Sequence, residues 1–180
     1  FRGNAVDVLD RYYQCAKKFS SKIIVRITAD NPLIDPNIVD DIINQFLKNS
    51  SDYITNANPR TYPYGTEVEV FSFQALEKAS NNAKKPSERE HVTPYFHNNK
   101  EEFKMSNIKF TENLSYLRWT VDRENDLKFV KKIISEIKSR PILMQDIIKL
   151  ISKKPKILNI NKNHIPNEGY LKSLNQDKFL

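Results

Sequence analysis

The chain has 180 residues, of which 39% are hydrophobic and 11% aromatic, which is enough for one domain with a buried core and excludes a disordered chain. Its net charge of +7 comes from 29 basic and 22 acidic residues that are interleaved along predicted helices, so we expect solvated helix surfaces and no nucleic-acid interface. No apolar run approaches the roughly 20 residues that span a bilayer, and the single Cys15 excludes an internal disulfide. These features predict a cytoplasmic protein.

Hydrophobic periodicity predicts strands that alternate with helices. In chain order, the expected elements are helix 7–19, strand 22–28, helix 36–48, strands 52–55 and 67–71, helices 73–81 and 87–98, strands 104–110 and 117–121, and helices 124–138 and 143–152. This alternation indicates an α/β fold, with antiparallel pairing where two strands follow one another directly. We therefore expect one domain over residues 1–152. Residues 153–180 are rich in lysine and asparagine, and we expect an extension there that packs on the domain or on a partner.

A carboxylate follows the first predicted strand, in the segment Arg26-Ile27-Thr28-Ala29-Asp30-Asn31-Pro32-Leu33-Ile34-Asp35. Pro32 biases Asn31 away from helix, so Asp30 is expected in the turn just past the carboxyl end of the strand. Ligands bind at that edge of open α/β sheets, and Mg²⁺ prefers oxygen ligands that it shares with substrate phosphates. The alternative is an ordinary turn aspartate, since Asp is common in such turns.

A second carboxylate, Asp122, occupies the same kind of position between the predicted strand 117–121 and the helix that begins near Glu124. If the two strands are parallel neighbours, Asp30 and Asp122 converge above the sheet and can hold one divalent ion. The alternative is that Asp122 caps the helix by accepting backbone N–H bonds, a role that is compatible with metal binding.

Four segments in this order resemble the cytidylyltransferases of the spore coat polysaccharide biosynthesis protein F type, which are similar to the acylneuraminate and 3-deoxy-manno-octulosonate cytidylyltransferases. The four segments are Asp7-Val8-Leu9-Asp10-Arg11-Tyr12-Tyr13, residues 26–35, Ser87-Glu88-Arg89-Glu90-His91-Val92-Thr93-Pro94-Tyr95, and Arg118-Trp119-Thr120-Val121-Asp122. The resemblance implies a Rossmann-like nucleotidyltransferase fold, similar to the nucleotide-diphospho-sugar transferases, with a mixed sheet flanked by helices.

The resemblance also implies an activity. Such enzymes transfer a cytidylyl group from CTP to a sugar or sugar acid and release pyrophosphate, for surface polysaccharide or glycan synthesis. It implies that Asp30 and Asp122 are catalytic residues that hold Mg²⁺. Members of the family begin with a strand and a loop of the form R-x-x-S-x-R-L-P-x-K, which this chain lacks, so we expect a fragment without the first strand-loop-helix unit that can be inactive alone. A homodimer is compatible with the resemblance.

Five residues are candidates for binding the substrate: Arg26, Glu67, Glu69, Arg89 and His91. Arg26 lies inside the strand before Asp30 and can reach a phosphate or support a carboxylate. Glu67 and Glu69 alternate with an apolar residue, so they share a face that either meets sugar hydroxyls or faces solvent. Arg89 can pair with a sugar carboxylate and His91 can donate a hydrogen bond, although a helix-surface network of salt bridges explains the Arg89 cluster nearly as well.

Two other readings remain open. One is a glycosyltransferase that uses a nucleotide sugar, since that chemistry also employs Mg²⁺ and carboxylates above a similar sheet. The other is a non-catalytic module that binds a sugar or a partner, which the missing amino-terminal loop would favour. Release of pyrophosphate or of free nucleotide separates the two enzyme readings.

Overall fold

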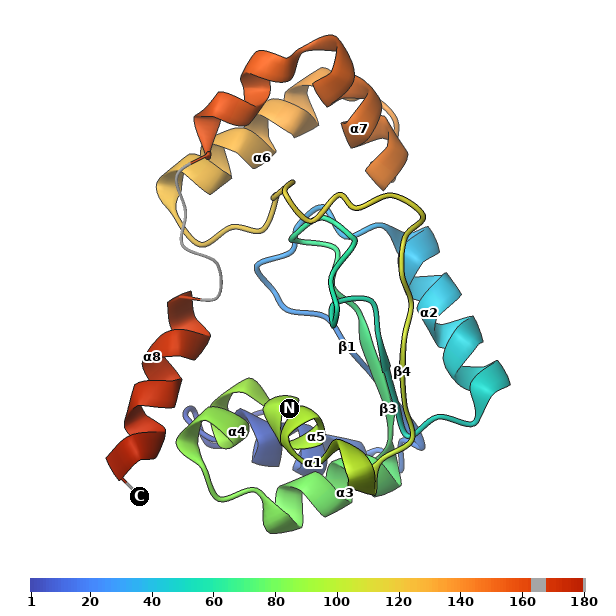
Figure 1. Cartoon of the computed structure of the whole chain (residues 1–180), viewed down its shortest axis with the longest axis vertical. Helices are drawn as coiled ribbons and strands as arrows, with labels where there is room; N and C mark the ends of the chain where they lie inside the picture. The colour runs from blue at the N-terminus through green and yellow to red at the C-terminus, as the bar shows by residue number, and fades with distance from the viewer. Residues whose placement is uncertain (163–167, 180) are drawn as a thin grey trace.

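The computed structural model describes residues 1–162 and 168–179, which form a small mixed sheet flanked by helices (Figure 1). The fold is α/β, as the sequence predicted. The strands are β1 (Ile23–Arg26), β2 (Tyr53–Thr55), β3 (Glu69–Ser72) and β4 (Met105–Asn107). The helices are α1 (Val8–Lys18), α2 (Pro36–Asn49), α3 (Phe73–Asn82), α4 (Pro86–His91), α5 (Pro94–Asn98), α6 (Glu124–Glu136), α7 (Met144–Lys153) and α8 (Glu168–Gln176), with short 3₁₀ turns η1 (Lys100–Glu102), η2 (Pro155–Ile160) and η3 (Asp177–Phe179).

The sheet has the strand order β1-β3-β2-β4. β3 pairs antiparallel with both β1 and β2, whereas β4 pairs parallel with β2. The register places Arg26, Glu69 and Thr55 opposite one another, in a row across three strands. Because side chains on directly paired residues point to the same face, this row forms one continuous strip of polar groups.

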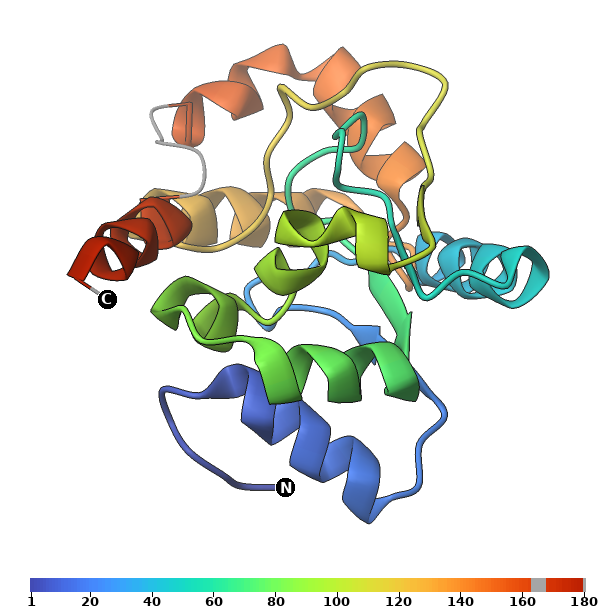
Figure 2. The same ribbon diagram turned by 60° about the horizontal axis from the view of Figure 1, so that its bottom comes forward.

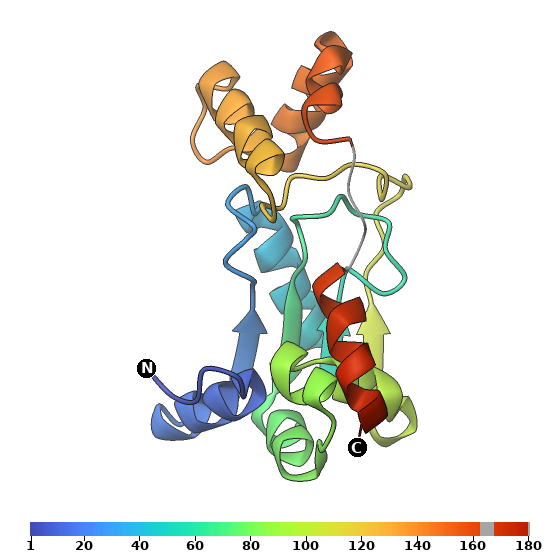
Figure 3. The ribbon, with the colours of Figure 1, turned by 90° about the vertical axis from the view of Figure 1, so that its left-hand side faces the viewer.

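Each face of the sheet contributes to a separate hydrophobic core. Alternate residues along one strand divide between the cores, as Ile54 and Tyr53 do in β2. Ile54 packs in the core that contains residues of α2, α6 and α7, and Tyr53 in the core with residues of α1, α3 and α5. Figure 2 shows α1 and α3 lying against one another, and Figure 3 shows α2 and α8 on opposite sides of the sheet.

Carboxylates accept backbone N–H groups at the start of four of the described helices, α1, α2, α6 and α7, the last through Asp146 and the N–H of Leu143 at 3.2 Å. Asp7 caps α1 by accepting from the N–H of Asp10 at 2.9 Å, and Asp35 caps α2 by accepting from the N–H of Asn37 at 2.8 Å. At α6, Asp126 accepts from the N–H groups of Asp122 and Arg123 at 3.1 and 3.0 Å. The alternative in which Asp122 caps α6 does not match the structure, because the N-cap residue is Arg123 and its N–H donates to Asp126.

Two predicted elements differ from the structure. Residues 117–121 form no strand and make only an isolated parallel bridge, between Arg118 and Tyr64. Their N–H groups bond to two separate segments, Trp119 to the carbonyl of Tyr64 and Val121 to that of Asp30, so no continuous ladder forms. The helix predicted over 87–98 is divided into α4 and α5, because Val92 has a positive φ of 72° and ends the first helix.

The carboxyl-terminal residues pack on helices in two places. η2 packs against α6 and α7, and α8 packs against α4. Asp177 accepts from the backbone N–H of Ser87 at 3.0 Å and from its hydroxyl at 2.6 Å. Residues 163–167 and 180 of the expected extension lie outside the described residues. Over the two described ranges, no helix combines the length and the apolar character that crossing a bilayer requires.

Among residues 1–162 and 168–179, β1 is an edge strand, since it pairs with β3 alone and stands at one end of the strand order. Its side chains Ile23 and Val25 are 39% and 37% exposed. In a paired strand with both faces covered, such β-branched residues would be buried. The outer side of β1 therefore presents backbone groups and apolar side chains together.

Gly65 lies where the loop before β3 meets residues 119–120. Its φ is +99°, and an added Cβ would lie 2.7 Å from the backbone nitrogen of Thr120. Because both the conformation and the contact exclude a side chain, we expect Gly65→Ala to lower the free energy of unfolding by about 2 to 4 kcal/mol in urea denaturation. Gly3→Ala is the control, since its added Cβ would meet the flexible side chain of Arg11, and equal losses in both variants would contradict the prediction.

Candidate functional site

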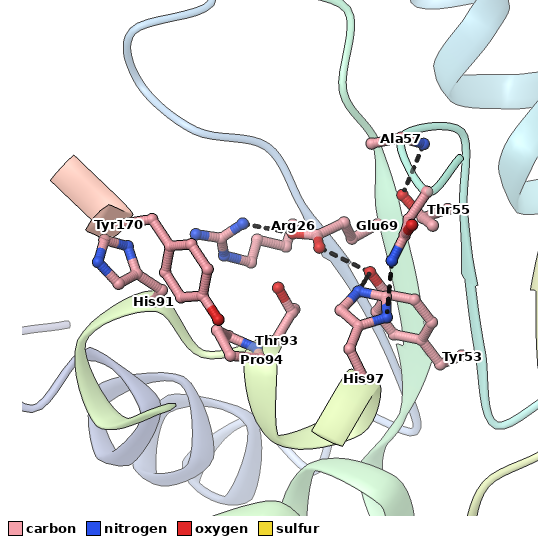
Figure 4. A pocket seen from close by; sticks show the side chains of 11 residues that line it. Arg26, Tyr53, Thr55, Ala57, Glu69, His91, Thr93, Pro94, His97 and Tyr170 are labelled. Carbon is pink, nitrogen blue, oxygen red and sulfur yellow. Dashed lines mark hydrogen bonds and ion pairs between the residues drawn. The ribbon is translucent and has the colours of Figure 1, made fainter. Parts of the chain in front are cut away.

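A polar pocket of about 440 Å³ opens on the face of the sheet that α4 and α8 flank (Figure 4). The strands supply its floor, and residues of α5, α8 and the end of α4 supply its walls. The lining residues are Arg26, Tyr53, Thr55, Ala57, Asn58, Glu69, His91, Thr93, Pro94, His97 and Tyr170. Three of the five predicted substrate residues, Arg26, Glu69 and His91, therefore meet in one pocket.

The pocket floor is the polar row that the strand register creates. Arg26 of β1 donates a hydrogen bond to Glu69 of β3 and forms an ion pair with it. Both side chains are largely buried, with 16% and 12% of their surface exposed. Glu69 therefore does not face bulk solvent, and the opposite charge of Glu69 raises the pKa of Arg26 although burial opposes this shift.

A chain of hydrogen bonds continues from Glu69 along the pocket. The hydroxyl of Tyr53 donates to Glu69 at 2.7 Å and lies 3.3 Å from Nε2 of His97. Because the tyrosine proton is used toward Glu69, we assign the proton to Nε2 of His97, which donates to the tyrosine oxygen. Nδ1 of His97 then accepts from the amide of Asn58 at 3.2 Å. The chain fixes both the tautomer and the ring orientation of His97.

His91 joins the pocket to the carboxyl-terminal helix α8. Its Nε2 lies 2.8 Å from the hydroxyl of Ser173, and its ring meets that of Tyr170 edge to face at 5.3 Å. Burial lowers the pKa of both His91 and His97 below the usual 6.5, since a desolvated imidazolium is disfavoured. Both rings are therefore neutral at pH 7, and each retains one N–H donor and one acceptor.

The two aspartate segments lie side by side at the end of the sheet where β1 finishes. The N–H of Val121 donates to the carbonyl oxygen of Asp30 at 2.8 Å, and the hydroxyl of Thr120 donates to the same oxygen at 3.2 Å. The expected reason for this proximity was wrong, because β1 pairs with β3 and 117–121 is no strand. The main chains of the two segments nevertheless meet one residue before Asp122.

The carboxylates of these aspartates have different surroundings. Oδ1 of Asp30 is buried and has no hydrogen-bond partner within the described part of the chain. The side chain of Asp122 is 56% exposed and forms an ion pair with the buried Arg118, which also contacts Asp126 at 3.4 Å. Asp30 thus offers an uncompensated acceptor, and Asp122 offers a carboxylate that Arg118 holds near the surface.

The structure places Glu67 and Arg89 apart from the pocket lining. Glu67 pairs with Arg60 and accepts from the amide of Asn31 at 3.1 Å and the N–H of Gly65 at 2.9 Å, so it braces the turn after Asp30. Arg89 donates from Nε to Asp7, the cap of α1, at 2.9 Å. It also donates to the carbonyl of Ser80 at 2.7 Å.

The buried Oδ1 of Asp30 has the chemistry of a ligand for a hard cation such as Mg²⁺. An unpartnered buried carboxylate oxygen is a site that a hard cation satisfies, and Mg²⁺ is commonly held by one or two carboxylates together with substrate phosphates. Among residues 1–162 and 168–179, no three His, Cys, Asp or Glu side chains gather as a metal cluster. Binding at this edge would therefore depend on the oxygens that a nucleotide brings.

Tyr53 and His97 were not among the predicted site residues. Tyr53 lies in a buried strand, where aromatic residues normally serve packing, and His97 lies on α5, 44 residues away in the sequence. No motif links them at that separation. The sequence held one signal for these partners. Glu69 alternates with valines in a strand, and once the face of the sheet that carries Glu69 is covered, its carboxylate needs a buried hydrogen-bond donor.

Comparison with known proteins places the chain among nucleotidyl-transferring enzymes. A family model described as cytidylyltransferase matches residues 1–165. The chain is 40% identical over 165 residues to the uncharacterized protein MJ1063 of Methanocaldococcus jannaschii, covering 91% of this chain and 67% of that protein. It is 28% identical over 159 residues to the spore coat polysaccharide biosynthesis protein SpsF of Bacillus subtilis, covering 86% and 65%.

A solved structure is also similar. The structure of a cytidylyltransferase from Leptospira borgpetersenii serovar Hardjo-bovis superposes with a TM-score of 0.86 at 37% identity, over 92% of this chain and 69% of that one. This chain spans about two thirds of the length of each of these relatives.

The pocket histidines predict a pH dependence of stability. Because the folded pKa values of His91 and His97 lie below 6.5, the unfolded chain binds more protons, so stability is highest above pH 6.5 and declines as the pH falls toward the folded values. We expect a lower urea midpoint at pH 5.5 than at pH 7.5, and NMR titration should give both rings a pKa below 6.5. In His97→Gln the difference between the two midpoints should shrink, and an unchanged difference would contradict a role for this ring.

We expect Arg89 to stabilise the fold rather than to bind a substrate. Arg89→Gln removes the link between α4 and the cap of α1, which is partly exposed, so we expect a loss of about 1 to 2 kcal/mol in urea denaturation. Asp7→Asn should cause a similar loss through the same contact. If Arg89→Gln changed the affinity for a sugar and left the stability unchanged, this prediction would be wrong and Arg89 would be a binding residue.

Proposed function

This chain belongs to the cytidylyltransferase family, and on that premise we propose that the protein transfers a cytidylyl group from CTP to a sugar, with release of pyrophosphate. The observation that carries the proposal is the likeness to a cytidylyltransferase structure across 92% of the chain at 37% identity. The geometry adds two features. One is the pair of aspartate segments at the end of β1, and the other is a polar pocket on the neighbouring face of the sheet.

In the proposed reaction an oxygen of the sugar attacks the α-phosphorus of CTP. A new oxygen–phosphorus bond forms, the bond from the α-phosphorus to the bridging oxygen breaks, and pyrophosphate leaves. If the attacking group is a hydroxyl, its proton passes to solvent or to a base. Negative charge builds on the phosphate oxygens during this step, and Mg²⁺ bound through Asp30 and Asp122 would stabilise that charge.

The chain's own residues have three tasks in this proposal. Asp30 presents its unpartnered oxygen beside the backbone of Val121, and Arg118 orients Asp122. Glu67 holds the turn after Asp30 through Asn31. The pocket that contains Arg26, Glu69 and His91 would hold the sugar, since polar hydrogen-bonding groups on a pre-formed floor are what orients a hydroxyl-rich ligand.

The biological role is proposed from a relative. The Bacillus subtilis protein is named for spore coat polysaccharide biosynthesis, and we propose that this chain likewise serves the synthesis of a surface polysaccharide or glycan. The free thiol of Cys15 accords with a reducing, cytoplasmic setting. A glycosyltransferase that consumes a nucleotide sugar would instead release free nucleotide, so the identity of the leaving group decides between the two enzymes.

Activity should depend on both aspartates. In the protein encoded by the complete reading frame, we expect Asp30→Asn and Asp122→Asn each to lower kcat/KM for pyrophosphate release from CTP by roughly 100-fold or more, because each removes a charged ligand at the developing phosphate charge. Asp40→Asn on the exposed side of α2 is the matched control and should retain activity.

The same experiment tests the metal. Titration with Mg²⁺ should show a higher metal requirement in the two site variants than in the control. Full activity of both site variants would contradict the assignment, and release of CMP or CDP in place of pyrophosphate would contradict the reaction.

A further inference from the structure

We propose that Tyr170 of α8 is a binding residue for the sugar acceptor, and that α4 holds α8 in the position where this ring completes the pocket. The inference rests on the proposed function, because it assigns a further residue to the acceptor site of that reaction. Tyr170 lies beyond residues 1–165, which the family model matches, so that match does not assign it to the site. The inference also gives a role to the segment 87–95, of which the proposed reaction names only His91.

The first step of the argument is the contact of Ser173 with α4. Ser173 lies on α8 and is 3% exposed. Its hydroxyl donates to the carboxylate of Glu90 at 2.6 Å, and its oxygen lies 2.8 Å from Nε2 of His91. Because the serine proton is used toward Glu90, Nε2 of His91 carries a proton and donates to the serine oxygen. One buried hydroxyl thus connects α8 to two residues of α4.

The second step is a further contact between the same two parts of the chain. Asp177, just after α8, accepts from the backbone N–H of Ser87 at 3.0 Å and from its hydroxyl at 2.6 Å. Ser87 is completely buried. Since Glu90 and His91 follow Ser87 by three and four residues, all three share one face of α4. The polar residues on this face of the segment 87–95 therefore hold the carboxyl-terminal helix.

The third step is the position that this contact gives to Tyr170. Its ring meets that of His91 edge to face, with 5.3 Å between the ring centres. Tyr170 lines the pocket of about 440 Å³ together with Arg26 and Thr93, and Figure 4 shows its ring extending from α8 into that pocket. The helix that α4 holds therefore supplies one wall of the pocket.

The fourth step is the difference between the two tyrosines that line this pocket in the described part of the chain. Tyr53 is fully buried, and the rings of Phe71 and Phe96 stack on it. Tyr170 is only partly buried, so part of its ring can meet a ligand. An aromatic ring offers a flat apolar surface, on which the C–H groups of a sugar ring pack while the sugar hydroxyls bond to polar neighbours. Tyr170 provides that surface beside the polar floor.

The experiment follows pyrophosphate release from CTP in the presence of Mg²⁺, using the protein from the complete reading frame. Four acceptors are offered separately: N-acetylneuraminate, 3-deoxy-manno-octulosonate, glucuronate and glucose. Tyr170→Ala should raise the KM for a reacting acceptor roughly tenfold or more, because the apolar surface under the sugar ring is lost. The kcat and the KM for CTP should stay unchanged, as expected when a mutation removes binding that is equal in the ground and transition states.

Two control variants separate the ring from the helix that carries it. Tyr170→Phe retains the ring and should retain the KM for the acceptor, and a rise equal to that of Tyr170→Ala would contradict packing on the ring. Leu171→Ala changes the next residue of α8, which is 51% exposed and does not line the pocket. This variant should leave all three kinetic constants unchanged.

Ser173→Ala tests whether α4 positions Tyr170. The variant removes the hydroxyl that bonds to Glu90 and His91, so the KM for the acceptor should rise roughly threefold or more, with kcat unchanged. Nitrogen NMR of His91 should show that the preference for a proton on Nε2 is weakened. A circular dichroism melt of each variant verifies that it is folded.

An unchanged KM for the acceptor in folded Tyr170→Ala or in folded Ser173→Ala would overturn the inference while the reaction itself stood. If Tyr170→Ala does not fold, Tyr170→Leu replaces it, because leucine keeps an apolar contact with His91 without a flat ring. Asp177→Asn replaces Ser173→Ala in the same case. The proposed function fails separately, when none of the four acceptors yields pyrophosphate, and the inference then fails with it.

Discussion

The ion pair between Arg26 and Glu69 is the contact on which the site depends. Each residue comes from a different strand, and their direct opposition is a consequence of the antiparallel register between β1 and β3. A shift of one residue in that register would turn both side chains to the opposite face of the sheet. The hydrogen bonds of Tyr53 and His97 then extend from the carboxylate of Glu69. The pairing of β1 with β3 therefore also determines which polar groups line the pocket.

A second constraint joins the loops beyond the strands. The backbone of residues 119–121 lies against Gly65 on one side and against Asp30 on the other. Only a residue without a Cβ allows the first approach, since a side chain at Gly65 would meet the backbone of Thr120. This packing brings Asp122 near Asp30 without strand pairing. The aspartate edge thus depends on loop contacts, whereas the pocket depends on the sheet.

The sequence predicted most of the helices and strands, but it predicted fewer of the contacts between them. Local signals such as Pro36 at a helix start and the alternation around Glu69 located α2 and β3 to within two residues. The strand predicted over 117–121 failed because hydrophobic alternation does not reveal whether a neighbouring strand is available to pair. The long helix predicted over 87–98 failed because nothing local announces the positive φ of Val92.

The candidate site divides in the same way. Arg26, Glu69 and His91 were found from residue type and position, and the structure brings them into one pocket. Their partners Tyr53 and His97 were missed, since the contact between them spans 44 residues and arises only in three dimensions. The alternative for Arg89, a salt bridge at a helix surface, matches its contact with Asp7. The role of Arg89 could therefore be assigned only once the packing of α1 on α4 was known.

The open side of β1 also governs how this polypeptide behaves at high concentration. In the part of the chain that the structure describes, β1 pairs on one side only, and an edge of this kind with exposed Ile23 and Val25 can accept another extended segment, in the way that sheets grow by adding strands. No proline or bulge interrupts the edge between Ile23 and Arg26, and its one charge, Arg26, is committed to Glu69. Handling of the isolated chain therefore calls for an edge charge, such as Val25→Lys, to keep it from assembling into higher-order sheets.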